Sequence, residues 1–384
     1  MADQRTTATV MAGIPAGNNS LFHRLQFNVG DPAAWIDIDG RTTMMVRDIE
    51  MQRARSHAVA DAVVCPADFT PQHGLSGDRE TATAQALAEL LRRAEVTTAI
   101  VDRTFPTSFA HELGSAGIAI DYDAQLGVAE RRAKGDHELD ALREAQSDTE
   151  AAMEMACRLV ANASADAHGV LHHDGAELTS ERVRNAIDVF LLARNYSNPS
   201  SIVACGPQCA DCHEKGTGPL RTAESVIIDI FPRNRSTLYN GDCTRTVVHG
   251  DVPDAVVHIH RIVAEAKASA IAVVRAGATG EQVHQATIDA ITAHGYPVGP
   301  PSDAPADDFV GMVHGTGHGV GLDVHEPPLL DLKGPELVVG DVLTVEPGLY
   351  GRLVGGVRIE DMVAVTVDGC ENFNTLHEGL DWSG

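Results

Sequence analysis

The sequence predicts a mixed protein of the α/β (α+β) class with two domains, residues 1–130 and 131–384. The first observation is the length of 384 residues, because single hydrophobic cores usually stop growing at about 250 to 300 residues. The second is that the first third of the chain alternates strand-like and helix-like segments, whereas a long helical pattern follows "RRAKGD" at 131–136. We therefore expect the domain boundary at this segment.

The first domain is predicted from three segments. Residues 33–48, "AAWIDIDGRTTMMVRD", favour two strands around Asp39-Gly40, because this dipeptide tolerates the positive φ of a tight hairpin. Residues 81–96 have the composition and apolar spacing of a helix, and residues 97–102, "TTAIVD", favour a strand. A small α/β domain follows from this alternation.

The second domain is predicted to begin with helices at 137–164 and 180–195. Strands are expected around "IIDI" and "NGDCTRTVV", followed by a helix at 253–274. Thr279 and Gln282 form a capping-box pair that opens another helix, which should stop at Gly295. A loop rich in Pro, Asp and Ala at 299–308 then leads into a glycine-rich and strand-rich C-terminal part.

Charge and composition exclude several classes of partner. The formal net charge of −25 repels nucleic acid and anionic lipid, so we expect neither as a partner. No apolar run approaches the ~18 residues of a membrane span, and the N-terminal stretch lacks the pattern of a secretory signal. Seven cysteines, an odd number, argue against a disulfide framework. We expect a cytoplasmic protein.

The stretch "ACGPQCADCHEKG" at 204–216 poses a separate question. Cys209, Cys212 and His213 have the spacing of a c-type haem attachment site, but the lack of an export signal argues against haem. Cys205, Cys209 and Cys212 are candidates for a separate zinc or redox site.

Four acidic residues lie inside apolar strand patterns: Asp229, Asp242, Glu346 and Glu360. Burying a carboxylate costs several kcal/mol unless it is paired or bound to a metal ion. Each of them alone could cap a turn or pair with an arginine, but together with His318, in the glycine-rich "HGTGHGVGLDVHE", they form an oxygen-rich donor set. Such a set suits a dinuclear site for Mn²⁺ or Co²⁺, with Zn²⁺ or Fe²⁺ as alternatives.

Five segments, in order, resemble the motif blocks of the pita-bread (M24-type) metallopeptidases, which include methionyl aminopeptidases, aminopeptidase P and prolidase: "IIDIF", "GDCTRT", "HGTGHGVGLDVHE", "TVEPGLY" and "GVRIED". The wording of 244–246, 346–348 and 358–361 is most similar to the Xaa-Pro peptidase branch. The resemblance covers about residues 130–384, and residues 1–130 are loosely similar to a creatinase-type domain. It implies a pita-bread catalytic domain after a smaller creatinase-type (RNase H-like) α/β domain.

The resemblance also implies the site residues. Its metal ligands fall on Asp229, Asp242, His318, Glu346 and Glu360, which would hold two divalent ions per chain. Its catalytic groups fall on His213, His325 and Glu346, and its substrate-binding groups on His314 and Arg358. In the implied mechanism a metal-bridging hydroxide attacks the scissile carbonyl, Glu346 accepts the proton, and His325 stabilises the oxyanion. His213 orients the substrate or assists proton delivery to the leaving nitrogen.

The implied activity is hydrolysis of Xaa-Pro bonds in a proline-containing peptide or dipeptide, by a homodimeric metallo-exopeptidase. The alternatives are another pita-bread hydrolase, either methionyl aminopeptidase or creatinase-like, and a non-catalytic binding protein with the same fold. All five ligand positions hold ligand residues, which counts against the creatinase-like and non-catalytic alternatives. The large first domain counts against a methionyl aminopeptidase. The choice between dipeptidase and aminopeptidase stays open.

One departure from the family pattern concerns the spacing of the first two ligands. Asp229 and Asp242 are 13 positions apart, two more than the resemblance predicts. On paired antiparallel strands an even insertion in the turn keeps both side chains on the same face of the sheet. We therefore expect both residues to remain ligands.

Overall fold

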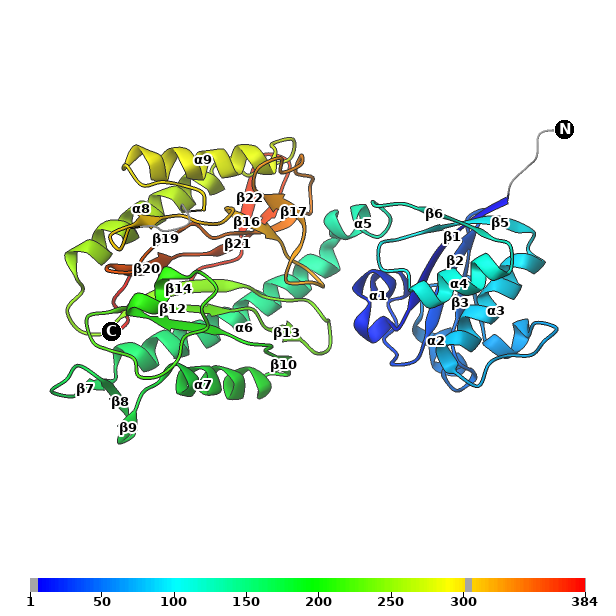
Figure 1. Cartoon of the computed structure of the whole chain (residues 1–384), viewed down its shortest axis with the longest axis horizontal. Helices are drawn as coiled ribbons and strands as arrows, with labels where there is room; N and C mark the ends of the chain where they lie inside the picture. The colour runs from blue at the N-terminus through cyan, green and yellow to red at the C-terminus, as the bar shows by residue number, and fades with distance from the viewer. Residues whose placement is uncertain (1–5, 301–305, 384) are drawn as a thin grey trace. The chain divides into compact units, whose positions relative to one another are not determined.

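The computed structural model describes residues 6–300 and 306–383, so half of the loop expected at 299–308 lies outside the described residues. The chain divides into two compact units between Arg131 and Arg132 (Figure 1).

The first unit is built on a six-stranded mixed sheet with the order β4-β3-β2-β1-β5-β6. β1 pairs antiparallel with β2 and parallel with β5. The strands are β1 Thr6–Gly13, β2 Ala33–Ile38, β3 Arg41–Met45, β4 Ala62–Val64, β5 Val96–Val101 and β6 Ala119–Tyr122. The helices are α1 Asn19–Leu25, α2 Met51–His57, α3 Arg79–Arg93 and α4 Thr107–Ser115, and α5 Ala129–Arg132 ends at the boundary.

Helices cover both faces of this sheet, because the strand residues alternate between two apolar clusters. Val10 and Ile36 pack with Leu87 of α3, whereas Met11 and Trp35 pack with Leu21 of α1. This alternation is the period of two that a strand imposes on its side chains. The first unit is thus a three-layer α/β/α structure.

The second unit contains several small antiparallel sheets. A five-stranded sheet has the order β17-β16-β18-β21-β22, and two three-stranded sheets have the orders β11-β12-β14 and β15-β19-β20. Their strands are β11 Ile202–Cys205, β12 Ser225–Ile230, β14 Cys243–Val248, β15 Val310–Gly311, β16 Gly317–Gly319, β17 Glu326–Leu330, β18 Val342–Val345, β19 Gly348–Gly351, β20 Gly355–Arg358, β21 Asp361–Val365 and β22 Cys370–Asn372. Five very short strands complete the unit: β7 Ser164–Ala165, β8 Leu171–His173, β9 Ala176–Glu177, β10 Tyr196–Ser197 and β13 Arg233–Asn234.

Four helices enclose these strands from opposite sides (Figure 1). They are α6 Asp136–Ala161, α7 Ser180–Leu192, α8 Asp254–Ile271 and α9 Gly280–Ala293. α6 packs on β12 and β14, and α7 packs on β11. α8 packs on β18, β19 and β20, and α9 packs on β17. The strands therefore lie between two helix pairs, and their inner residues are fully covered.

The predicted elements agree closely with the observed ones. Asp39 and Gly40 have φ values of 53° and 80° in the turn between β2 and β3, as the predicted hairpin requires. Thr279 and Gln282 form the predicted capping box at the start of α9. None of the helices in residues 6–300 and 306–383 has the length and apolar character that a membrane span needs.

Candidate metal centre

The first two predicted ligands come from neighbouring antiparallel strands. Asp229 on β12 pairs with Thr244 on β14, and Asp242 lies two residues before Thr244. Since side chains two residues apart share a face of a strand, Asp229 and Asp242 point to the same side of the sheet. The longer turn between the strands therefore preserves their common direction, as the even insertion predicted.

The other three predicted ligands arrive from the C-terminal sheets. His318 lies on β16, Glu346 follows β18, and Glu360 stands between β20 and β21. The backbone NH of Glu360 donates to the carbonyl of Thr244 at 3.1 Å, which joins this segment to β14. The NH of Glu346 donates to the carbonyl of Thr316 at 2.8 Å, two residues before His318. Backbone hydrogen bonds between the sheets thus bring all five side chains together.

The five side chains form one cluster. One carboxylate oxygen from each of Asp229, Asp242 and Glu360 lies within 4.8 Å of the other two. The Nε2 atom of His318 lies 3.4 Å from Glu346 Oε1 and 3.9 Å from Asp242 Oδ2. Its Nδ1 lies 3.1 Å from the carbonyl of Gly319, which fixes the proton on Nδ1 and leaves the Nε2 lone pair directed at the carboxylates.

Burial and mutual repulsion raise the pKa of three of these carboxyls. Burial is the main cause for Asp242, and the charges of Glu360 and Asp229 add to it. Burial also raises the pKa of Glu360, with the charge of Glu346 as the next cause. The pKa of Glu346 is raised from 4.5 to about 7, again chiefly by burial, which the nearby Arg358 opposes.

The cluster fits divalent metal ions. Its donors are four carboxylates and an imidazole, and the buried Oδ1 atom of Asp229 has no hydrogen-bond partner among the described residues. Such an atom costs free energy unless a cation or another donor satisfies it, and the like charges cost more still. Divalent ions held by Asp229, Asp242, His318, Glu346 and Glu360 would relieve both penalties.

Arg358 lies at the edge of this cluster and is almost fully buried. Its Nη2 donates to Asp229 Oδ2 at 2.8 Å, and its Nε donates to Thr244 Oγ1 at 3.2 Å. Its Nη1 donates to the hydroxyl of Tyr350 and to the carbonyl of Cys212, both at 3.1 Å. Every nitrogen of this guanidinium therefore already has a protein acceptor, and one of its bonds orients Asp229.

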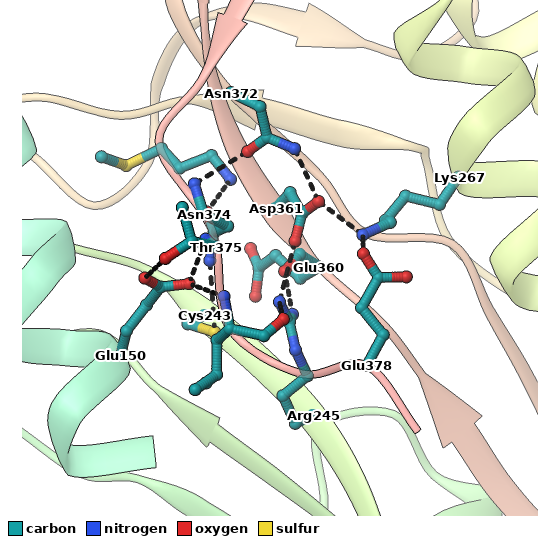
Figure 2. Close-up of polar contacts among 12 residues, drawn as sticks. Glu150, Cys243, Arg245, Lys267, Glu360, Asp361, Asn372, Asn374, Thr375 and Glu378 are labelled. Atoms are coloured by element: carbon teal, nitrogen blue, oxygen red, sulfur yellow. Dashed lines mark hydrogen bonds and ion pairs between the residues drawn. The ribbon is translucent and has the colours of Figure 1, made fainter. Parts of the chain in front are cut away.

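A buried network of charged and polar groups surrounds the predicted ligand Glu360 (Figure 2). Arg245, with no exposed side-chain surface, donates to the backbone carbonyl of Glu360 and to Asp361 Oδ1. Lys267 donates to Asp361 Oδ2 and to Glu378 Oε1. Burial alone would raise the pKa of Asp361, but Lys267 and Arg245 outweigh it and hold the pKa below its usual value. These bonds fix the backbone carbonyl of Glu360 and the side chain of Asp361, which follows it.

Helix α6 fixes the other ligand strand and the C-terminal segment. Gln146 is fully buried, donates to the backbone carbonyl of Asp242 at 2.7 Å and accepts from its NH at 2.9 Å. Glu150 accepts from the backbone NH groups of Thr375 and Leu376 at 2.9 and 2.8 Å (Figure 2). One helix therefore holds both Asp242 and the segment that carries Glu378.

The predicted histidines all line the same pocket as the carboxylates, which has a volume of about 540 Å³. Burial, followed by the charge of Arg358, lowers the pKa of His314 to about 4, so this imidazole is neutral at pH 7. Its Nδ1 lies 2.7 Å from the carbonyl of Gly315, so its Nε2 accepts from the Tyr350 hydroxyl at 2.6 Å. The ring of His325 lies edge-on to His318, with 4.3 Å between centroids, and His213 is exposed.

The pocket also contains residues that the sequence interpretation did not single out. Lys215, Phe231 and Asp331 line it together with the predicted residues. The chain has four lysines, and Lys215 lies only two positions after the predicted site residue His213. This proximity could have indicated that Lys215 lines the pocket. Phe231 directly follows the strand of Asp229, so its place could have been inferred from the motif "IIDIF".

The thiols of Cys205, Cys209 and Cys212 do not form a metal-ligand group in the part of the chain that the structure describes. Cys205 and Cys209 are buried, and the Cys209 thiol lies 3.1 Å from the carbonyl of Ala204. Cys212 instead forms a possible donor group with its neighbours Asp211 and His213. Burial raises the pKa of Cys209 to about 11, so this thiol is protonated at neutral pH.

A pocket that holds a cluster of four carboxylates and one imidazole, at the meeting point of antiparallel sheets, is the kind of site that metal-dependent hydrolases use. The model of metallopeptidase family M24 matches residues 140–367. The chain belongs to this family.

Curated relatives match about half of the chain. "Uncharacterized peptidase YqhT" of Bacillus subtilis is 39% identical over 191 residues, which is 49% of this chain and 50% of the relative. The Xaa-Pro dipeptidase of Pyrococcus furiosus is 33% identical over 182 residues, or 47% of this chain and 48% of the relative. The chain thus spans about half the length of the curated relatives it matches.

Solved structures resemble the chain over nearly its whole length. An Xaa-Pro dipeptidase from Bacillus anthracis has a TM-score of 0.79 at 23% identity, covering 97% of this chain and 94% of its own. An X-Pro aminopeptidase from Thermotoga maritima has a TM-score of 0.78 at 20% identity, covering 98% and 97%. These similarities confirm the predicted fold class, a mixed α/β chain with a pita-bread unit.

Proposed function

We propose that the chain is a dinuclear-metal-dependent exopeptidase that hydrolyses Xaa-Pro bonds in short peptides. The observation that carries the proposal is the cluster of five donors in one pocket, with the buried Asp229 Oδ1 lacking a partner among the described residues. The names of the relatives from Pyrococcus furiosus and Bacillus anthracis support the Xaa-Pro specificity.

The proposed ligands are Asp229, Asp242, His318, Glu346 and Glu360, and Mn²⁺ is the proposed metal, with Co²⁺, Zn²⁺ or Fe²⁺ as alternatives. Bound divalent ions would supply a water molecule acidified toward neutral pH and would polarise the scissile carbonyl.

The remaining chemistry belongs to side chains of the pocket. Glu346 is the proposed proton acceptor, since its carboxylate lines the pocket and its Oε1 lies 3.4 Å from His318 Nε2. His325 is the proposed donor to the developing oxyanion, because it packs against His318 and lines the pocket. His213, exposed at the same pocket, would orient the substrate or deliver a proton to the leaving nitrogen.

A proline side chain has to be recognised by shape, because the leaving imide nitrogen carries no NH. The pocket offers apolar surface for the ring from Ile202, Phe231, Val324 and Leu329. His314 lines the same pocket as a neutral imidazole held by Tyr350, so it would contribute shape without charge. Arg358 would act from behind by orienting Asp229.

Hydrolysis of Ala-Pro and Ala-Pro-Ala after reconstitution with Mn²⁺, Co²⁺ or Zn²⁺ separately tests the proposal. Glu346→Ala and His318→Ala should lose activity by a factor of more than about 1,000 and should bind less metal by elemental analysis. Chelation should abolish activity reversibly. Glu371→Ala, which removes an exposed carboxylate paired with Arg143, is the matched control and should remain active. Metal binding without hydrolysis of either substrate, or full activity in either ligand variant, would refute the proposed function.

We also propose a cytoplasmic homodimer. Seven free cysteines, four of them buried, fit a reducing compartment. The family resemblance supports the dimer, and light scattering on the purified chain would test it.

A further inference from the structure

Lys215 carries an uncompensated positive charge at the proposed active site. Lys134 and Lys267 are buried and paired with carboxylates, Lys134 with Glu326 at 2.7 Å. Lys215 is exposed, lines the pocket, and its ammonium has no hydrogen-bond or ion-pair partner among the residues that the structure describes. A free cation in the pocket of a chain with a net charge of −25 calls for a ligand.

The backbone that carries Lys215 is fixed against the central sheet. The carbonyl of Lys215 accepts from the NH of Val203 on β11 at 3.0 Å and from Arg184 Nη1. The following residue, Gly216, has a φ of +77°, and a Cβ atom there would lie 1.7 Å from the carbonyl oxygen of Val203. Only glycine allows this close approach, so the segment holds Lys215 at a defined place beside the pocket.

The other charged groups of the pocket are already engaged. Arg358, the second permanent cation of the lining, has an acceptor for each of its nitrogens and is bonded to Asp229. Asp331, the lining carboxylate outside the ligand cluster, accepts from the NH of Leu332 and lies 3.5 Å from His284 Nε2. Two divalent ions would neutralise the four ligand carboxylates, and the charge of Arg358 would offset that of Asp331. The pocket would then carry a net charge of +1, which comes from Lys215.

We propose that Lys215 is the subsite for the C-terminal carboxylate of an Xaa-Pro dipeptide and so makes dipeptides the preferred substrates. The inference rests on the proposed function. In such a dipeptide the carboxylate carbon is two bonds from the scissile nitrogen, and the proline ring holds it in a fixed direction. The flexible stem of a lysine can follow this anion and present it with a point charge. A longer peptide moves its carboxylate about 3.5 Å farther for each added residue.

The test compares Ala-Pro, its amide Ala-Pro-NH₂ and Ala-Pro-Ala with the Mn²⁺-loaded full chain. Lys215→Ala should lower kcat/KM for Ala-Pro about tenfold, mainly through KM, as expected for the loss of one charge-assisted hydrogen bond. It should leave kcat/KM for the amide unchanged, and Lys215→Arg should retain the preference for Ala-Pro. Lys333→Ala removes another exposed lysine that does not line the pocket, and all three substrates should be unaffected.

Equal losses on Ala-Pro and its amide in Lys215→Ala, or no loss on Ala-Pro, would overturn the inference. Failure of the wild-type chain to hydrolyse any of the three substrates would overturn the proposed function instead. Calorimetric binding of Ala-Pro and its amide to the same proteins then decides the role of Lys215. Tenfold weaker binding of Ala-Pro alone in Lys215→Ala supports the carboxylate subsite, and equal binding by both proteins overturns it.

Discussion

Removing the metal ions should make the stability of the chain fall as the pH rises. Burial raises the pKa of Glu346 from 4.5 to about 7, so the metal-free folded state holds this proton more tightly than the unfolded state does. Below pH 4.5 Glu346 is protonated in both states and does not lower the free energy of unfolding. As the pH rises from 4.5 through about 7, the free energy of unfolding falls progressively.

The expected size follows from the same shift. At about 1.4 kcal/mol per pH unit, a rise in pKa from 4.5 to about 7 corresponds to about 3 kcal/mol of lost stability. For a unit of this size, that loss lowers the melting temperature by roughly 6 to 12 °C. The raised pKa values of Asp242 and Glu360 act in the same direction.

Thermal melting at pH 5 and pH 8 measures the effect. Chelated wild-type protein should melt at a clearly lower temperature at pH 8 than at pH 5, and added Mn²⁺ should remove most of the difference, because the cations neutralise the carboxylates. The glutamine in Glu346→Gln cannot titrate. Between pH 5 and pH 8 the free energy of unfolding of the chelated variant should therefore change by about 3 kcal/mol less than that of the chelated wild type. The same dependence on pH in the chelated wild type and in the chelated variant would refute this reasoning.

Three further predictions concern the structure around the site. Lys267→Met removes one cation from Asp361 and leaves Arg245 and Asn372 as its partners. The variant should lower the free energy of unfolding, measured with denaturant, by about 3 kcal/mol. A loss below about 1 kcal/mol would contradict the role of this buried pair. Gly216→Ala should destabilise the chain by more than about 2 kcal/mol, because a Cβ would collide with Val203, whereas Gly40→Ala, with a similar φ and open space, should cost only about 1 kcal/mol. In the folded chain at pH 8 the buried thiols should resist iodoacetamide for hours, whereas the partly exposed Cys65 should react within minutes. If mass spectrometry finds the buried thiols and Cys65 modified at equal rates, the burial of these thiols is contradicted. The buried thiols are Cys157, Cys205, Cys209 and Cys243.

The positions of Asp229, Asp242, Glu346 and Glu360 could be inferred because each is a charged residue inside an apolar strand pattern. It could also be inferred that Asp229 and Asp242 point to the same side of the sheet, since the number of residues between two positions on paired strands determines which face each side chain takes. These features depend on local periodicity, which a sequence displays directly.

The supporting residues could not be predicted in the same way. Gln146 and Glu150 lie on α6, where a polar residue is equally compatible with solvent, and their partners Asp242 and Thr375 are far along the chain. The small sheet of β7, β8 and β9 has strands of only two or three residues, too short to display an alternation of apolar and polar residues. For Lys215 the sequence offers only its place near His213, because the proposed role depends on which other cations of the pocket already have partners.

The segment at 372–378 is attached to Arg245, Lys267 and Glu150, and this has a consequence for the order of events during synthesis. Domains fold as units, and those nearer the N-terminus fold first as they leave the ribosome. The first unit can close on its own sheet early, because all six of its strands lie before residue 123. The backbone around Glu360, in contrast, waits for Asn372 and Glu378 to emerge. A nascent chain stalled before these residues would expose the carboxylate cluster without its supporting partners, so tight metal binding should begin only near the end of translation of this unit.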